Sequence, residues 1–160
     1  MAIREIRIDG DPILKKVCRP VSKLSDRQQE LIDDMLETMY EANGVGLAAP
    51  QVGVLRRIVV IDVGEGPLVM VNPEITEKDG EQTGEEGCLS VPGKAAIVTR
   101  PEHVIARAFD RNMKEFTVEG TGLLARAICH ELDHLDGHMY TEIAESPLMD
   151  VKYDEEEEIE

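Results

Sequence analysis

The stretch of the chain best suited to chemistry is His130-Glu131-Leu132-Asp133-His134, which has the pattern H-E-x-x-H. In a helix, residues four positions apart lie on the same face, so the two imidazoles can bind one metal ion. Glu131 lies beside them and can exchange a proton with a water molecule bound to that ion. The competing interpretation is a solvated helix that carries two histidines by chance, because the motif alone is not specific. The metal interpretation therefore needs support from the rest of the chain.

A cysteine far from this motif supplies a third candidate ligand. Cys88 lies among glycines and acidic residues in the segment 85–93, where a cysteine has little packing purpose. With His130 and His134 it forms a set of three ligands that leaves a fourth position open. Catalytic metal sites have this arrangement, whereas structural zinc sites usually have four protein ligands. We therefore predict a catalytic metal site.

Three further side chains with metal-binding chemistry are left outside this set. His138 follows Gly137, the glycine at which we expect the helix to end. His103 precedes a predicted strand and is interpreted as a surface histidine. Cys129 is the neighbour of His130, and one residue is about 100° of helix, which argues against a second thiolate ligand.

The 160 residues carry a net charge of −16, and 42% of them are hydrophobic. This composition fits one globular domain with a core of its own. The negative charge argues against a DNA-binding protein, because the phosphates would repel it. The chain shows no signal peptide and no stretch near the roughly 18 apolar residues of a membrane span. With three cysteines and no secretion signal, we expect a cytoplasmic protein with reduced thiols.

We expect a single catalytic domain over residues 1–148 and a flexible tail over residues 149–160. The tail ends in a run of acidic residues, 154–160. Like charges in such a run repel one another and stay solvated, so no packed structure is expected there.

Two helices are predicted. The first begins at Ser25, which forms a capping box with Gln28, and ends at Asn43-Gly44. The second carries H-E-x-x-H and ends at Gly137. It is apolar on most sides, which is typical of a buried helix at the centre of a fold.

The strands are predicted from β-branched and alternating runs. Residues 57–62 and 68–72 form a predicted hairpin, and Pro73 ends its second strand. Asp79-Gly80 is a second hairpin signal. Further strands are expected at 95–99, 103–109 and 115–118.

The segment 44–53, between the first helix and the first strand, is rich in glycine and small residues. Its glycines allow the backbone to approach another group closely. A phosphate-binding loop does not fit, because the segment follows a helix and lacks the Lys-Ser/Thr ending. An extended loop that pairs with a peptide fits better, and Gln51 offers it both a donor and an acceptor.

Three motifs together resemble the peptide deformylase family: residues 44–51 (GVGLAAPQ), 86–90 (EGCLS) and 130–134 (HELDH). Their order and spacing match as well, and the resemblance covers residues 3–145. It implies an α+β fold, with antiparallel β-sheets packed around a central helix carrying H-E-x-x-H and a further N-terminal helix. It also implies a hydrolase that removes the formyl group from the N-terminal formylmethionine of newly made bacterial polypeptides and releases formate.

The resemblance implies that Cys88, His130 and His134 hold one divalent metal ion. The metal of the family is typically Fe²⁺, and Ni²⁺, Co²⁺ or Zn²⁺ can replace it. The three ligands by themselves do not choose between these ions.

The resemblance implies catalytic roles for three other residues. Glu131 takes the proton of the metal-bound water and delivers it to the leaving amine. The Gln51 side-chain amide and the Leu89 backbone N–H match the family's donors to the formyl oxygen, on which negative charge develops.

A pocket for the methionine side chain is expected on the same helix. Leu123, Arg126 and Ala127 lie seven, four and three residues before His130, on its face of the helix. Leu123, Ala127 and the aliphatic stem of Arg126 can therefore wall a pocket beside the metal. The family also places the residue matching Val45 in its methionine pocket.

The implied partner is the formylmethionyl end of a nascent polypeptide. Backbone around Val45, Gly46 and Gly87 would pair with the extended peptide, as in strand addition. We also expect transient association with the ribosome. Some bacterial members dock there through a basic C-terminal helix, and the acidic end of this chain argues against that mode.

The chain departs from the family pattern at two positions near the motifs. The family usually has Gln directly before the first histidine ligand, where this chain has Cys129. Several relatives have Arg seven residues after the cysteine ligand, where this chain has Ala95. The first change alters a contact behind the ligands, and the second removes a polar contact to the peptide.

Two rival functions remain open. A zinc endopeptidase would cleave internal peptide bonds, but such enzymes normally take a third ligand downstream of H-E-x-x-H, and here the candidate is upstream. An inactive, metal-stabilised binding module would be expected to have lost Glu131 or Gln51, and both are present.

Overall fold

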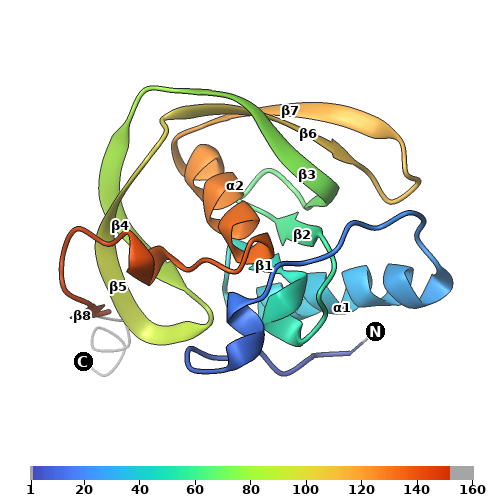
Figure 1. Cartoon of the computed structure of the whole chain (residues 1–160), viewed down its shortest axis with the longest axis horizontal. Helices are drawn as coiled ribbons and strands as arrows, with labels where there is room; N and C mark the ends of the chain where they lie inside the picture. The colour runs from blue at the N-terminus through green and yellow to red at the C-terminus, as the bar shows by residue number, and fades with distance from the viewer. Residues whose placement is uncertain (1, 152–160) are drawn as a thin grey trace.

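The computed structural model describes residues 2–151 and shows an α+β fold, as expected. Helices α1 and α2 are joined by short 3-10 turns and by strands that form two antiparallel sheets (Figure 1). The larger sheet has the order β1-β2-β3-β6-β7, and the smaller sheet has the order β4-β5-β8. The elements are α1 (Asp26–Glu41), α2 (Gly122–Leu135), β1 (Gly46–Ala48), β2 (Ile58–Ile61), β3 (Leu68–Asp79), β4 (Gln82–Cys88), β5 (Val91–Arg100), β6 (His103–Phe109), β7 (Glu115–Thr121), β8 (Met149–Asp150) and the turns η1 (Pro12–Lys15), η2 (Ala49–Val52) and η3 (Tyr140–Glu142).

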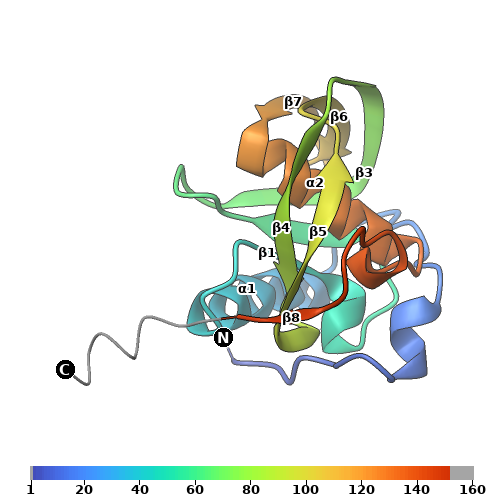
Figure 2. The same ribbon diagram turned by 90° about the vertical axis from the view of Figure 1, so that its left-hand side faces the viewer.

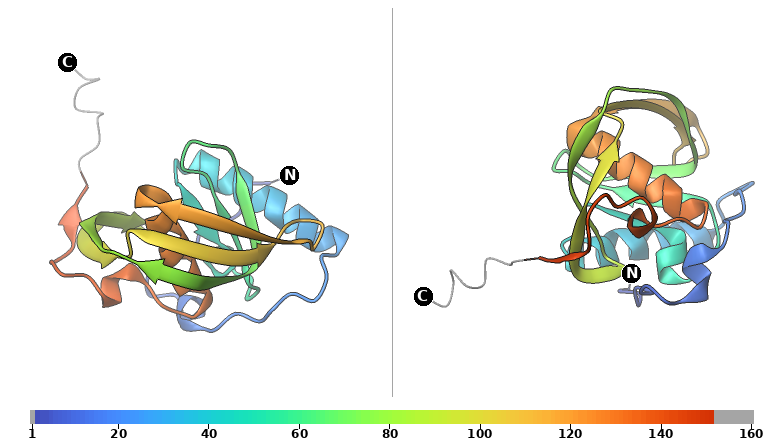
Figure 3. Two further views of the ribbon diagram at one scale, coloured as in Figure 1. Left: turned by 90° about the horizontal axis from the view of Figure 1, so that it is seen from above. Right: turned by 60° about the vertical axis from the view of Figure 1, so that its left-hand side comes forward.

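Helix α2 is the centre of the fold, as its apolar composition predicted. The strands β3, β6 and β7 arch over it, and the β4–β5 hairpin lies along its side (Figures 1 and 3). Its buried residues Ala125, Ile128, Leu132 and Leu135 belong to one apolar cluster with residues of β2, β3 and β6. Each fully buried Leu or Ile contributes roughly 1.5–3 kcal/mol to stability, so this helix is held mainly by its packing.

Helix α1 packs on the opposite face of the larger sheet (Figure 2). The capping box of Ser25 and Gln28 is confirmed. The helix ends at Glu41, two residues before Asn43, which has φ 57°. The Gly44 N–H then donates to the Met39 carbonyl at 2.9 Å. Strand β2 is consequently covered on both sides, which explains its uninterrupted apolar sequence. Val59 and Ile61 pack toward α2, whereas Ile58 and Val60 pack toward α1.

The structure corrects two predictions about strand β3. The β2–β3 hairpin is present, but β3 continues through Pro73 to Asp79. Its register against β6 shifts between Val71 and Glu74, so the proline, which has no N–H to donate, falls at an irregularity of the ladder. Asp79-Gly80 does not close a hairpin either, because β3 pairs with β2 and β6 whereas β4 pairs with β5. The turn instead carries the chain from one sheet to the other.

The end of the described chain pairs with the smaller sheet. Met149 and Asp150 form β8 opposite Ala95 and Lys94 of β5. Residues 152–160, which include the acidic run, lie outside the described residues, so the flexible tail stays a prediction. Neither described helix is long and apolar enough to cross a membrane.

The glycine that follows α2 should be essential for stability. Gly137 has φ +81°, and an added Cβ would lie 2.5 Å from the backbone oxygen of Lys15. Gly93 has a similar φ of +75°, and an added Cβ there would meet nothing within 4 Å. We expect Gly93→Ala to cost about 1–2 kcal/mol for the left-handed backbone and Gly137→Ala to cost about 1–3 kcal/mol more for the collision.

Urea unfolding of the two alanine variants beside the wild-type protein measures this difference. Equal losses of stability in both variants would show that the contact between Gly137 and Lys15 imposes no constraint.

Candidate metal centre and active site

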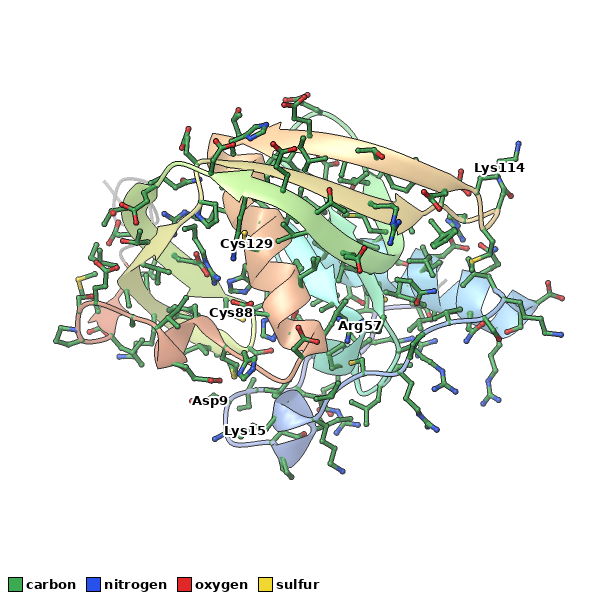
Figure 4. The ribbon with its side chains drawn as sticks, turned by 45° about the horizontal axis from the view of Figure 1, so that its top comes forward. Asp9, Lys15, Arg57, Cys88, Lys114 and Cys129 are labelled. Atoms are coloured by element: carbon green, nitrogen blue, oxygen red, sulfur yellow. The ribbon has the colours of Figure 1, made fainter. Side chains whose placement is uncertain are left out.

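The three predicted ligands meet at one point of the structure. His130 and His134 lie one turn apart on α2, with ring centroids 4.9 Å apart. Cys88, at the end of β4, places its Sγ 3.3 Å from Nε2 of His134. The donor atoms of all three residues lie within 4.8 Å of one another. Figure 4 shows Cys88 beside α2, on the side of the β4–β5 hairpin.

This donor set fits a divalent transition metal. One soft thiolate and two borderline imidazoles suit iron, cobalt, nickel or zinc. Three protein ligands leave a further position for water or substrate, as in catalytic sites. Among the described residues no other cluster of three His, Cys, Asp or Glu has this geometry, and Cys129, His103 and His138 lie outside it.

His130 is held by a buried carboxylate to which no role was assigned from the sequence. Nδ1 of His130 lies 2.5 Å from Oε2 of Glu86. An ionised carboxylate only accepts, so Nδ1 carries the proton and Nε2 is left to bind metal. Glu86 lies two residues before Cys88 in β4 and therefore on the same face of the strand. That alternation within E-G-C-L-S is the signal that could have identified it.

Two arginines complete the surroundings of Glu86. Arg100 donates to it from Nε at 3.0 Å and from Nη2 at 2.6 Å, and Arg126 donates from Nη1 at 2.8 Å. Burial alone raises the pKa of Glu86, but hydrogen bonds from His130 and Arg100 outweigh it and bring the pKa to about 2. Glu86 is therefore an anion at neutral pH.

Glu131 lies in a very different environment. It is buried, and its Oε1 has no hydrogen-bond partner among the described residues. Burial raises the pKa of Glu131 to about 7, so this carboxyl can take up and release a proton near neutral pH. A Cβ on Gly46 would collide with its Oε2, which explains why a glycine stands there. The close backbone approach predicted for this loop is thus an approach of β1 to Glu131.

Gln51 is buried with its amide held in one orientation. Its Oε1 accepts from the Ala48 N–H at 2.9 Å, and its Nε2 donates to the Ser90 hydroxyl at 3.0 Å. The same nitrogen lies 3.6 Å from Sγ of Cys88. The amide donor therefore faces the cluster. Leu89 lies in the turn between Cys88 and Ser90, and its side chain packs where a Cβ of Gly44 would otherwise be.

The residues predicted to receive substrate divide into exposed and buried groups. Val45 and Leu123 are 42% and 51% exposed, so they are free to contact another molecule. Gly46 lies on β1 and Gly87 on β4, and each of these is an edge strand of its sheet. Within the described chain, both glycines therefore lie on a strand with one unpaired edge. Ala127 is buried beside His130 on α2. The methionine pocket at these residues stays a prediction.

Arg126 differs from the expectation of a simple pocket wall. It is buried, and its guanidinium points to Glu86 and to the Val98 carbonyl, which accepts from Nη2 at 3.1 Å. A cavity of ≈ 590 Å³ elsewhere on the molecule is lined by Cys129 and Arg100 but by none of the predicted ligands. The groups that could react therefore lie at the converging donor atoms and not in that cavity.

The chain is similar to known proteins of one family. Residues 3–148 match the family model described as polypeptide deformylase. The chain belongs to this family. It is 67% identical to a peptide deformylase of Agathobacter rectalis over 158 residues, covering 99% of this chain and 100% of the relative. It is 60% identical to one of Lachnoclostridium phytofermentans over 162 residues, covering 99% of each chain.

Solved peptide deformylases have the same fold. The enzyme of Legionella pneumophila superposes with a TM-score of 0.86 at 46% identity, covering 88% of this chain and 85% of that one. The enzyme of Thermotoga maritima superposes with a TM-score of 0.87 at 40% identity, covering 91% and 99%. As a member of this family, the chain is a hydrolase that removes the formyl group from the N-terminal methionine of polypeptides, and the family uses a divalent metal.

The two thiols of α2 and β4 offer a direct test of the ligand set. We expect Cys88→Ser to weaken Ni²⁺ binding by more than roughly 10–100-fold, which is the typical effect of losing a group that hydrogen-bonds to a metal ligand. Cys129→Ser should retain most of its affinity, because Cys129 lies outside the cluster. Metal content after dialysis and circular dichroism of both variants provide the measurement. Equal metal loss in two folded variants would show that the thiol is misassigned.

Proposed function

We propose that Cys88, His130 and His134 hold the divalent metal of this enzyme and that Glu131 transfers the proton beside it. The observation that carries the proposal is the meeting of the Cys88 thiol with two histidines of α2: its Sγ lies 3.3 Å from Nε2 of His134, and the three donor atoms lie within 4.8 Å of one another. When bound, the metal lowers the pKa of a water molecule and polarises the formyl carbonyl. The remaining steps fall to residues of the chain.

Glu131 moves the proton. Its Oε1 is buried without a partner among the described residues and can accept the proton of the attacking water. The pKa of about 7 allows this near neutral pH. As the bond between the formyl carbon and the methionine nitrogen breaks, Glu131 delivers the proton to that nitrogen. One water is consumed, and formate and a free amino terminus are released.

Gln51 and Leu89 stabilise the charge that develops on the formyl oxygen. The Gln51 amide is already oriented by Ala48 and Ser90, so it need not reorganise during the reaction. The backbone N–H of Leu89 supplies a second donor from the turn after Cys88. Losing one such donor typically costs about 3–4 kcal/mol of transition-state stabilisation.

The methionine side chain lies against α2 in this proposal. Val45 and Leu123 offer exposed apolar surface, and Ala127 with the stem of Arg126 forms the wall behind them. A long, unbranched and apolar side chain suits such a surface. The peptide backbone pairs with the free edges near Gly46 and Gly87.

In this proposal the metal in the cell is Fe²⁺, the typical metal of the family. Ni²⁺, Co²⁺ or Zn²⁺ can replace it, because all of these ions accept mixed thiolate and imidazole ligands. The partners are nascent formylmethionyl polypeptides, which places the enzyme in the cytoplasm with transient ribosome association. Residues 1–148 form the catalytic domain.

Formate release tests the proposal. We expect anaerobically prepared protein loaded with Fe²⁺ or Ni²⁺ to release formate from formyl-Met-Ala-Ser. Glu131→Ala should lower the rate about 10²–10⁴-fold, the usual contribution of a general acid–base. Glu115→Gln, at an exposed glutamate of β7, is the matched control and should keep the wild-type rate.

No formate from the loaded wild-type protein would contradict the proposal. Cleavage of unformylated casein would favour the endopeptidase alternative, and metal binding without either activity would favour an inactive binding module.

A further inference from the structure

We propose that Arg126 is a positioning residue that orients His130 through Glu86. This inference rests on the proposed role of His130 as a metal ligand. It assigns to Arg126 a second task beside the pocket wall predicted for its aliphatic stem.

The two oxygens of Glu86 have different partners. Oε1 accepts from Nη1 of Arg126 at 2.8 Å and from Nε of Arg100 at 3.0 Å. Oε2 accepts from Nη2 of Arg100 at 2.6 Å and from Nδ1 of His130 at 2.5 Å. Arg126 thus occupies one oxygen while the other is directed at the imidazole.

Arg126 is itself anchored at two points. Besides Glu86 in β4, its guanidinium reaches the Val98 carbonyl in β5, so one planar fork joins α2 to two strands of the smaller sheet. The side chain of Arg126 is only 9% exposed and that of Glu86 only 4%. Because Arg126 lies one turn before His130 on the same helix face, the fork and the imidazole meet the same carboxylate.

Arg100 cannot take over this task. Its Nη1 already donates to Asp133 at 2.7 Å, and the Asp133 side chain is 38% exposed. Without Arg126, Oε1 loses a charged donor in a buried place, and the Val98 carbonyl loses its partner as well. Losing a charged donor to a buried carboxylate costs free energy, and Arg100 is then the donor that remains on Oε1. We expect the carboxylate to rotate toward Arg100, which would move Oε2 away from Nδ1 of His130 and change the orientation of the imidazole ring.

Three substitutions separate this role from simpler ones. Arg126→Met keeps the aliphatic wall and removes the fork. Arg126→Lys keeps the charge but reaches Glu86 or Val98, not both. Arg107→Met, which breaks the exposed pair of Arg107 with Glu74, is the matched control.

The readouts are the Ni²⁺ dissociation constant by chelator competition, the absorption spectrum of the Co²⁺-loaded protein, and urea unfolding of the metal-free protein. We expect Arg126→Met to bind Ni²⁺ about 10–100-fold more weakly, the usual effect of losing a partner that orients a ligand. Its Co²⁺ bands should shift, since they report ligand geometry. Arg126→Lys should lie between Arg126→Met and the wild type, and Arg107→Met should match the wild type.

Unchanged Ni²⁺ affinity and Co²⁺ bands in a folded Arg126→Met would overturn the inference, even if its stability fell. A raised KM for formyl-Met-Ala-Ser with unchanged metal affinity would also overturn it, in favour of the wall alone. If Arg126→Met does not fold, the Arg126→Lys spectrum decides in the same way. His130→Ala that binds Ni²⁺ as tightly as the wild type would instead refute the ligand set itself.

Discussion

The carboxylate of Glu86 lies buried between α2 and the β4–β5 hairpin, where a charge is tolerated only when it is fully paired. Arg100, Arg126 and His130 all donate to it. Since these donors come from the central helix and from the end of β5, the pairing joins the helix to the smaller sheet. Cys88 follows Glu86 by two residues, so the hydrogen bonds to Glu86 also determine where the Cys88 thiol lies relative to the two histidines. The buried Glu86 carboxylate thus joins the elements that carry the three ligands of the proposed metal site.

Two buried glutamates of this site have opposite properties because their surroundings differ. Glu86 has charged donors on both oxygens, and its pKa is about 2 in spite of burial. Glu131 has one oxygen without a partner among the described residues, and burial raises its pKa to about 7. The first is a permanent anion that orients a ring, and the second can carry a proton. Pairs of titratable groups with divergent pKa values are typical of enzyme active sites.

Packing around α2 holds the side chains of the site in place. The helix is enclosed by the arch of β3, β6 and β7 and by β2, so its histidines have little freedom to move. Gly46 lets β1 pass close to Glu131, and Ser90 holds the Gln51 amide toward Cys88. The loops that carry these residues are separated by tens of residues in the chain. Their positions follow from the two sheets that meet on the helix.

The sequence by itself determined the chemistry and much of the fold. H-E-x-x-H defines a helix face through a spacing of one turn, and the capping box at Ser25 and the alternation in the strands are equally local signals. Two predictions from local signals were wrong, because tertiary contacts decide the strand pairing. Pro73 is tolerated inside β3 at a register shift, and Asp79-Gly80 connects β3 to a strand of the other sheet. Three features of the site likewise arise only in the folded chain. They are the short distance between Cys88 and the histidines, the hydrogen bond from Arg126 to Glu86 and the raised pKa of Glu131. Each of them depends on burial and on partners remote in sequence, which no local pattern of residues encodes.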